Sequence, residues 1–473
     1  MKILYVVHYF LPRHQAGTEI YTALLARAMR AKGHEVTVFT SEDGRPASGR
    51  FELKSDDWEG MSVLRLMRGE PPDFARSYSD PEIDGIFRSV LNDERPDAVH
   101  FQHVFRLSAG MIGAAKESGA RTIVTLADYW FICPPILLLR PGHDLCPGPE
   151  PDRCARCGNA IGALYSGAPG SALMGSENPR LAVIGGLAHS AYDRGVRAAH
   201  AVKRRLPRSW VEKARAWKQS RELDDAGSAF QQRRALLDER RTVMRETLSA
   251  ADLVIAPSDY LRMKYLEAGV VAPEKIVTSD YGFDHAPFVG VNRASSDHPR
   301  LGFIGTPVEH KGVHVAVEAM NHLMDTNAEL IVYGDLTWFP AYARRLKRLA
   351  KNPRVSFRGR FENRDAARIL AGLDALIVPS LWCENSPLTI HEAFMAGVPV
   401  ITSDLGGMAE LVKNGGGTTF KTGGPADLAA VIRALISEPG KLESLRLSIP
   451  AVKSIEENAE ELLHYYSGGS TGK

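Results

Sequence analysis

Two glutamates, Glu384 and Glu392, bracket seven residues in an otherwise apolar stretch of the chain. Between them, Ser386 is a residue type that caps helix N-termini, and Pro387 suits the first helical position. The apolar spacing that follows predicts a helix that continues to Gly397. One acid is therefore expected in the loop before a helix start, and the other about one turn inside the helix.

The start of this predicted helix has the chemistry of an anion site. The N–H groups of Leu388 and Thr389 are expected to be unpaired at the positive end of the helix dipole, where a phosphate binds readily. The sugars on the two sides of a bound diphosphate could then be reached by Glu384 and by Glu392. The plainer alternative is that both carboxylates are solvated or act as helix caps.

Other residues suited to phosphate and sugar chemistry fall at strand ends or helix starts. Lys311 lies in a turn between a strand and a helix, where its ammonium could neutralise phosphate. Gly17 and Thr18 open a helix after the first strand, and His103 and Asp128 follow later strands. Ligands of doubly wound sheets bind beyond the carboxyl ends of the strands, so these residues are expected to face one site. Each of them alone also fits an ordinary surface turn.

Four of the five cysteines gather in one Pro- and Gly-rich loop. The last two have a Cys-x2-Cys spacing that is typical of zinc ligands, and His143 could replace one thiol. A loop with few apolar residues gains most from a metal, so we expect a structural Zn²⁺; the alternative is four reduced thiols, some of them buried. The four residues are Cys133, Cys146, Cys154 and Cys157.

Length and composition set broad limits. A chain of 473 residues is too long for one hydrophobic core, which predicts two domains. The net charge of +2 indicates no nucleic-acid partner. No segment has the roughly 18 to 20 apolar residues of a membrane-spanning helix, and the N-terminus resembles a buried strand more than a signal peptide. We therefore expect a cytoplasmic protein that could be peripheral to the inner face of the cell membrane.

Strand and helix patterns alternate in two cycles, which is typical of doubly wound parallel α/β sheets. The first cycle covers residues 1–290 and contains the Cys-rich loop at about 133–157 and a helical insertion at about 158–250. The second cycle covers 291–450, and residues 451–473 form a C-terminal helix and flexible tail. The predicted architecture is two Rossmann-like domains that face a central cleft.

The insertion is locally basic. Residues 203–246 carry thirteen Lys and Arg against seven Asp and Glu, together with Trp210 and Trp217. Such a helix could lie against anionic lipid headgroups with its tryptophans at the interface. A solvated pair of charged helices is the commoner outcome of this composition.

Taken together, these segments resemble a known family over most of residues 1–440. The pieces that carry the resemblance include "HYFLPRHQAGTEIYTALLARAM", "PDAVHFQH", "DYWFICP", "GFIGTPVEHKGVHVAVEA" and "PSLWCENSPLTIHEAFMAGVPVITSDLGG". They are similar to the retaining GT-B glycosyltransferases of family four, the glycosyl transferases group 1, many of which build bacterial polysaccharides. The pair Glu384 and Glu392, with an apolar strand before it and "AGVPV" after it, is highly specific in that combination.

The resemblance implies a role for each site residue. Glu384 would contact the donor sugar, Glu392 would contact the ribose of a nucleotide-sugar, and Lys311 with the helix-start amides would hold the diphosphate. It implies no cofactor for catalysis and a front-face attack in which the departing phosphate accepts the acceptor's proton. The expected catalytic residues are Glu384, Lys311 and His103, and the expected donor-binding residues are Gly17, Thr18, Thr306, Asn385, Ser386, Pro387, Leu388, Thr389 and Glu392.

The chain departs from the family pattern at two positions. Thr306 stands where the family usually has Arg, which removes a cation from the diphosphate site and about 1.5 to 3 kcal/mol if that group made a charged hydrogen bond. Ala127 stands where the family commonly has His beside the donor sugar. Three interpretations are open: His103 or Asp128 takes over part of that role, this subgroup does not need the histidine, or activity is weak.

The sequence therefore predicts a retaining glycosyltransferase that moves a sugar from a nucleotide-sugar to a glycan or lipid-linked acceptor, in cell-surface polysaccharide biosynthesis. The alternative is a non-catalytic scaffold that binds a nucleotide-sugar or glycan, which Ala127 and Thr306 favour. A nicotinamide-dependent dehydrogenase fits poorly, since no Gly-x-Gly-x-x-Gly follows the first strand.

Overall fold

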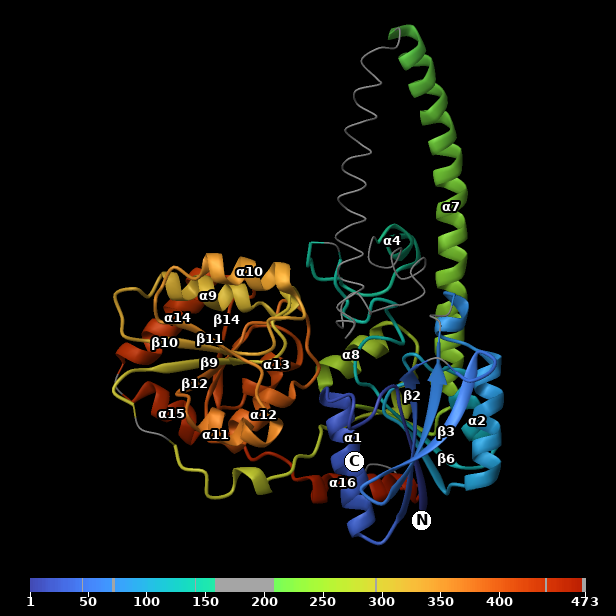
Figure 1. Cartoon of the computed structure of the whole chain (residues 1–473), viewed down its shortest axis with the longest axis horizontal. Helices are drawn as coiled ribbons and strands as arrows, with labels where there is room; N and C mark the ends of the chain where they lie inside the picture. Colours follow the sequence, from blue (N-terminus) through green and yellow to red (C-terminus); the bar gives the residue numbers. More distant parts are fainter. Residues whose placement is uncertain are drawn as a thin grey trace.

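The computed structural model shows two doubly wound α/β domains side by side (Figure 1). It describes the chain apart from residues 45, 70–72, 141, 158–207, 294–295, 439 and 470–473, and apart from the side chains of 208–226. The first half of the predicted insertion and the end of the predicted flexible tail therefore lie outside the described residues.

The N-terminal domain is built on an eight-stranded sheet in the order β3-β4-β2-β1-β5-β6-β7-β8. All neighbouring strands are parallel except β3, which is antiparallel to β4. Buried runs such as "ILYVV" explain why: strands covered by helices on both faces are apolar throughout. The strands are β1 (Lys2–Val7), β2 (Glu35–Asp43), β3 (Phe51–Trp58), β4 (Met61–Arg68), β5 (Ala98–Phe101), β6 (Arg121–Thr125), β7 (Leu253–Ala256) and β8 (Ile276–Thr278).

Helices cover both faces of this sheet. The α-helices are α1 (Gly17–Ala31), α2 (Pro81–Glu94), α3 (Gly110–Glu117), α4 (Pro151–Arg156), α7 (Arg208–Ala250) and α8 (Asp259–Glu267). Short 3-10 turns are η1 (Ala75–Ser77), η2 (Pro273–Lys275) and η3 (Ala286–Phe288). The helix α7 reaches far beyond the body of the domain, and only its C-terminal part packs against the sheet (Figure 1).

The C-terminal domain has a six-stranded parallel sheet in the order β11-β10-β9-β12-β13-β14. Its strands are β9 (Arg300–Ile304), β10 (Glu329–Tyr333), β11 (Val355–Gly359), β12 (Ala375–Val378), β13 (Val400–Ser403) and β14 (Gly417–Phe420). Its helices are η4 (Glu309–Lys311), α9 (Val313–Asn321), α10 (Pro340–Leu349), η5 (Asn363–Asp365), α11 (Ala366–Ala371), α12 (Leu388–Met395), α13 (Gly406–Val412), α14 (Pro425–Ser437) and α15 (Lys441–Leu447).

The last helix, α16 (Ile455–Tyr466), crosses back to the N-terminal domain. Its residues join the buried cluster formed by β1 and α1, and Tyr466 Oη lies 3.2 Å from Tyr5 Oη and 2.7 Å from His100 Nδ1. Where the chain passes between the domains, Phe283 and Ser454 form an isolated parallel bridge. The polypeptide therefore connects the two domains twice, along adjacent paths (Figure 1).

The two sheets confirm the predicted fold class, and one hairpin was not predicted. β3 and β4 form a hairpin closed by a two-residue turn, in which Glu59 and Gly60 both have positive φ, 54° and 72°. The segment "FELKSDDW" forms a largely exposed strand, and its many polar residues leave no clear alternation of apolar and polar side chains by which it could have been recognised. Among the described residues, no helix is both long and apolar enough to span a membrane.

Candidate functional site

Glu384 lies in the loop after β12 and is bound by two neighbours. Lys311 Nζ donates to its Oε1 over 2.6 Å, and Ser380 Oγ donates to the same oxygen over 2.6 Å. Burial alone would raise the pKa of this carboxyl, but Lys311 and Ser380 together hold the pKa below its ordinary value. A buried carboxylate thus stays ionised at neutral pH beside Lys311.

The position of Lys311 depends on a close approach between two loops. The next residue, Gly312, has a φ of 68°, and a Cβ at that position would lie 1.8 Å from the carbonyl oxygen of Pro379. Leu381 N also donates to the carbonyl of His310 over 2.7 Å. Only a glycine lets η4 lie so close to the end of β12, and this contact brings Lys311 to Glu384.

The start of α12 differs in detail from the prediction. The helix begins at Leu388, with Pro387 in the N-cap position, and Ser386 does not cap it. Instead, Ser386 Oγ donates to Asp280 Oδ1 over 2.6 Å and lies 2.8 Å from His391 Nε2. The charged hydrogen bond to Asp280, from the other domain, holds the Ser386 hydroxyl away from the N–H groups from which a capping oxygen would accept.

The first turn of α12 still has the features of an anion site. Within the described part of the chain, the N–H groups of Leu388 and Thr389 have no hydrogen-bond partner. The side chain of Leu388 lies at the beginning of α1, because a Cβ on Gly17 would lie 3.0 Å from Leu388 Cδ1. The predicted helix-start amides and the predicted glycine opening thus meet across the domain interface, and Thr18 is the second residue of α1.

Glu392 lies one turn inside α12, largely buried. Burial raises the pKa of this carboxyl to about 7. No hydrogen bond or ion pair joins its carboxylate to the described residues, and the side chain keeps some contact with solvent, so its oxygens remain accessible to a ligand. An unpaired carboxyl at the domain interface is suited to accept hydrogen bonds from ligand hydroxyl groups.

On the N-terminal side, His103 and Asp128 pair. His103 Nε2 lies 2.9 Å from Asp128 Oδ2, while His103 Nδ1 accepts from the Phe105 N–H over 2.9 Å, which places the ring proton on Nε2. The neighbouring Ala127 carbonyl accepts from Asn385 Nδ2 of the C-terminal domain. The loop of Glu384 and the His103–Asp128 pair therefore face each other.

A second buried pair lies behind the first. His8 Nε2 is 3.3 Å from Glu19 Oε1, and the His8 ring centroid is 4.7 Å from that of His103. Burial lowers the pKa of His8, and it raises the pKa of Glu19. His8 Nδ1 and Glu19 Oε2 are buried without a hydrogen-bond partner among the described residues. Two histidines and two acids thus line the carboxyl ends of β1, β5 and β6.

Sequence reasoning missed several residues that join the domains here. Tyr129 Oη donates to the Cys383 carbonyl over 2.8 Å, and Tyr260 Oη donates to Cys383 Sγ over 2.9 Å. Glu410 accepts from the N–H groups of Asp259 and Tyr260, both over 2.9 Å. The signal was weak, since a tyrosine after a strand or in a helix suits an ordinary core equally well. Cys383 is buried and is hydrogen-bonded by both of these tyrosines.

Thr306 follows β9 and precedes η4, which places it on the same edge of the sheet as Lys311. It is partly exposed there. Thr306, which stands where the family usually has Arg, is therefore five positions before Lys311, the lysine that contacts Glu384.

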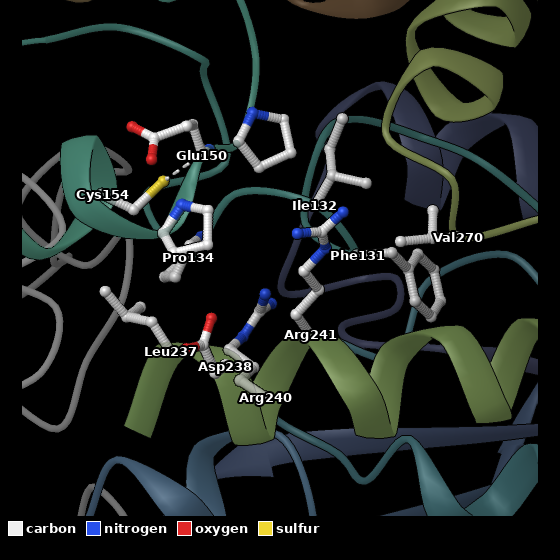
Figure 2. A pocket seen from close by; sticks show the side chains of 12 residues that line it. Phe131, Ile132, Pro134, Glu150, Cys154, Leu237, Asp238, Arg240, Arg241 and Val270 are labelled. Atoms are coloured by element: carbon white, nitrogen blue, oxygen red, sulfur yellow. Dashed lines mark hydrogen bonds between the residues drawn. The ribbon is translucent and has the colours of Figure 1, made fainter. Parts of the chain in front are cut away.

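The four cysteines of the Cys-rich loop lie away from this site, where the loop packs against α7. Cys133, Cys146 and Cys154 pack against the same apolar core, and Cys154 Sγ accepts from the Glu150 N–H over 3.4 Å. Figure 2 shows Cys154 and Glu150 on one side of a pocket and Arg240 and Arg241 of α7 on the other. All four thiols, Cys157 included, are unpaired by disulfides.

The described residues give the predicted zinc no ready set of ligands. Nowhere in the part of the chain that the structure describes do three or more His, Cys, Asp or Glu side chains form a group that could hold a metal ion. Burial raises the pKa of the Cys133 thiol and of the Cys154 thiol, and this effect exceeds the opposing charges of Arg240 and Arg153, so both thiols are neutral. Zinc binding stays a prediction.

The fold and the interface define the class of protein. The sucrose-phosphate synthase of Thermosynechococcus elongatus superposes with a TM-score of 0.61 at 15% identity, covering 99% of this chain and 98% of that one. Anabaena HepE in complex with UDP and glucose gives a TM-score of 0.61 at 15% identity, covering 99% of both chains. The chain has the GT-B fold of glycosyltransferases.

Family profiles make the assignment more specific. The profile described as "Glycosyl transferases group 1" matches residues 288–451, and "Glycosyl transferase 4-like domain" matches residues 16–156. These segments contain both halves of the interface described above. The chain belongs to the glycosyl transferases group 1 family, as the sequence motifs predicted.

Curated relatives match over part of their length. The glycogen synthase of Mycobacterium tuberculosis is 32% identical over 166 residues, which is 33% of this chain and 39% of that protein. The spore coat protein SA of Bacillus subtilis is 27% identical over 180 residues, 35% of this chain and 47% of that protein. The matched stretches span less than half of either relative.

Proposed function

We propose that this protein is a retaining glycosyltransferase that transfers a sugar from a nucleotide-sugar to a glycan or lipid-linked acceptor in cell-surface polysaccharide biosynthesis. One observation carries the proposal: an ionised, buried Glu384 contacts Lys311 beside the open amides of α12, opposite the His103–Asp128 pair. A nucleotide-sugar donor offers a matching group to each part of this site: its sugar to Glu384, its diphosphate to Lys311 and the α12 amides, and its ribose to Glu392.

The donor would bind along α12. Its diphosphate would accept from the N–H groups of Leu388 and Thr389 and from Lys311, which then shares its charge between phosphate and Glu384. Glu384 would accept from hydroxyls of the transferred sugar, and Glu392 from the ribose. In this arrangement the groups that stabilise the leaving diphosphate are in place before the reaction begins, which is how charge is best stabilised.

The chemistry proposed at this site is retention by front-face attack without a metal. Glu384 is engaged by Lys311 and Ser380, so its role is to position the sugar and not to attack the anomeric carbon. The acceptor oxygen would form the new glycosidic bond while the bond to the diphosphate breaks, and the leaving phosphate oxygen would take the acceptor's proton. The family commonly has a histidine at the position of Ala127. In its place, His103, held by Asp128, would orient the acceptor hydroxyl.

The acceptor has two candidate classes. The likeness to a glycogen synthase brings an α-glucan into consideration, whereas lipid-linked glycans fit a protein with a basic helix next to the body of the first domain. Arg233, Arg234, Arg241 and Arg245 lie in the described part of that helix, and contact with anionic headgroups through 203–246 would bring the protein to a membrane surface.

Turnover with a panel of nucleotide-sugars tests the proposal. The protein should release nucleotide slowly from one donor in the absence of acceptor, and Glu384→Ala should lose this release while circular dichroism shows a folded protein. Lys413→Ala, an exposed lysine in the same domain, is the matched control for Lys311→Ala. Analysis of the anomeric configuration of the product tests retention, and activity in the presence of a strong chelator tests independence from metal.

A non-catalytic scaffold is the second candidate, and Ala127 and Thr306 favour it. A scaffold would bind a nucleotide-sugar with the same residues and release no nucleotide from any donor. Nucleotide binding without turnover of any donor in the panel would therefore favour the scaffold over the enzyme.

We also propose that the Cys-rich loop holds a structural Zn²⁺, with thiols drawn from Cys133, Cys146, Cys154 and Cys157. What supports it is the packing of Cys133, Cys146 and Cys154 against one core and the absence of a disulfide at any of the four. Binding would require side-chain movements, since the four do not form a ligand group as they lie. Protein purified without chelator should contain about one zinc per chain, and a ratio near zero would leave four reduced thiols as the answer.

A further inference from the structure

Two arginines gather at the outer part of the N-terminal sheet, away from the donor residues. Arg68 ends β4, and Arg106 lies in the loop that follows β5. Arg68 Nη1 donates to the carbonyl of Arg106, and Arg106 Nη2 contacts Asp43 Oδ1 at the end of β2. The carboxyl ends of three strands thus place two guanidinium groups together.

This pair of cations is short of acceptors. Arg68 is 3% exposed, and its Nε as well as the Nε of Arg106 are buried without a hydrogen-bond partner among the described residues. Burial, and then the charge of Arg106, lower the pKa of Arg68 to about 10. Asp43 contacts one of the two guanidinium groups, accepts from Tyr9 Oη over 2.8 Å and is itself 56% exposed, so a single carboxylate serves a site with donors to spare.

The backbone of Arg106 supports a functional reading. Its φ is 62°, in the left-handed region that a long side chain seldom adopts. Such strain persists where the surrounding structure requires it and is concentrated at binding sites. Here it brings the carbonyl of Arg106 to Arg68 and the guanidinium to Asp43.

Aromatic rings connect these arginines to the reacting centre. The Arg106 guanidinium lies over the Tyr9 ring, 5.3 Å from its centroid, and Tyr9 stacks on His14 at 4.0 Å. Tyr9 is 5.3 Å from His8, and His8 is 4.7 Å from His103. A continuous row of rings therefore runs from His103, which faces the donor side, to the arginine pair.

We propose that Arg68 and Arg106 form an acceptor subsite for an anionic group, phosphate or carboxylate, carried by the acceptor. Two guanidinium groups bind such oxygens through paired N–H donors, and the partly exposed, stacked rings of Tyr9 and His14 give the rest of the acceptor a surface on which to lie. The anion would replace Asp43 as the partner of Arg106. The inference rests on the proposed glycosyl transfer, because it assigns this edge of the sheet to the acceptor.

Binding of small probes separates this proposal from the proposed function. The donor site is first filled with the nucleoside diphosphate that binds, so that Lys311 no longer competes for phosphate. Calorimetry then compares glucose 6-phosphate, glucuronic acid and glucose. The subsite predicts binding of one or both charged sugars and at least about tenfold weaker binding of glucose, since a charged hydrogen bond is lost. The preferred probe shows whether the anion is a phosphate or a carboxylate.

Variants locate the binding. Arg106→Gln should weaken the charged probe at least about tenfold and leave nucleotide affinity unchanged. Arg68→Gln should do the same, and thermal melting shows whether either variant is misfolded. Arg88→Gln is the control, because Arg88 is an exposed arginine paired with Glu117.

Each outcome decides between the proposals. Equal binding of glucose and the charged sugars, no binding of any charged sugar, or full binding by a folded Arg106→Gln would overturn the subsite. A protein that binds no nucleoside diphosphate would instead overturn the proposed function, and the arginine pair would then fall with it.

Discussion

Removal of Lys311 should expose the energetic cost of a buried Glu384. In Lys311→Met the methylene packing is largely retained while the 2.6 Å ion pair is lost. Breaking a buried pair by removing one partner costs about 3 to 5 kcal/mol. Lys311 is 31% exposed and Glu384 is 8% exposed, so solvent reaches the cation and we expect a loss of about 2 to 3 kcal/mol of unfolding free energy at pH 8.

The loss should depend on pH in a defined direction. In the wild-type protein the pKa of Glu384 lies below its ordinary value, so the pair adds stability above the unfolded pKa and loses it as the pH falls. In Lys311→Met, burial instead raises the pKa of Glu384. That variant keeps a neutral acid at low pH and loses stability as the pH rises. The contribution of the wild-type pair is already complete at pH 5, so the difference between the two proteins should be present there and should grow towards pH 8, where only the variant loses further stability.

Urea unfolding at both pH values measures this difference. A double variant, Lys311→Met with Glu384→Gln, should recover most of the loss at pH 8, because no charge is left buried. Lys413→Met, an exposed lysine of the same domain, should change stability by less than about 0.5 kcal/mol. A loss that is the same at pH 5 and pH 8, or a double variant no more stable than Lys311→Met, would show that the buried charge is not the cause.

Three further changes test other parts of the site. The unliganded wild type should lose about 2 to 3 kcal/mol of unfolding free energy between pH 4.5 and about pH 7, because the raised pKa of Glu392 makes its ionisation unfavourable in the folded state. Glu392→Gln should not show this loss, and thermal melting at several pH values measures it. Gly312→Ala should cost more than about 3 kcal/mol in urea, since its Cβ would meet Pro379 O, whereas Gly33→Ala, at a φ of 84° with nothing within 4 Å, should cost about 1 to 2 kcal/mol. Glu410→Ala should release the two N–H groups of α8 and increase the radius of gyration in small-angle X-ray scattering; an unchanged radius would mean that the other contacts suffice.

The sequence predicted the fold class and most strands because their signal is local. Apolar runs such as "ALIV" and "VITS" are buried on both faces, so their hydrophobicity alone identifies them. The β3–β4 hairpin was not predicted, because β3 is an exposed edge strand with few apolar side chains to bury. Its two-residue turn at Glu59 and Gly60 could have been found, but a Glu-Gly pair is a weaker hairpin signal than Asn-Gly.

The site was predictable where the chemistry lies in adjacent residues. The order of Glu384, the helix start and Glu392 is fixed by the chain itself, and the structure keeps it. The partner of Ser386 was not predictable, because Asp280 is more than a hundred positions away in the other domain. The arginine pair was missed for the same reason, since the ends of β4 and β5, which have β2 and β1 between them, come to the same edge only in the folded sheet.

The crossing of α16 has a consequence for synthesis. Tyr466 completes hydrogen bonds with Tyr5 and His100, and Asn458 accepts from Tyr21, so the first domain to leave the ribosome lacks part of its own core until α16 emerges. The C-terminal domain, whose two sheet edges and helices lie between residues 300 and 447, can close before that. The half of the enzyme made first is thus finished last, and a chain cut short before residue 455 leaves an incomplete N-terminal domain beside a complete C-terminal one.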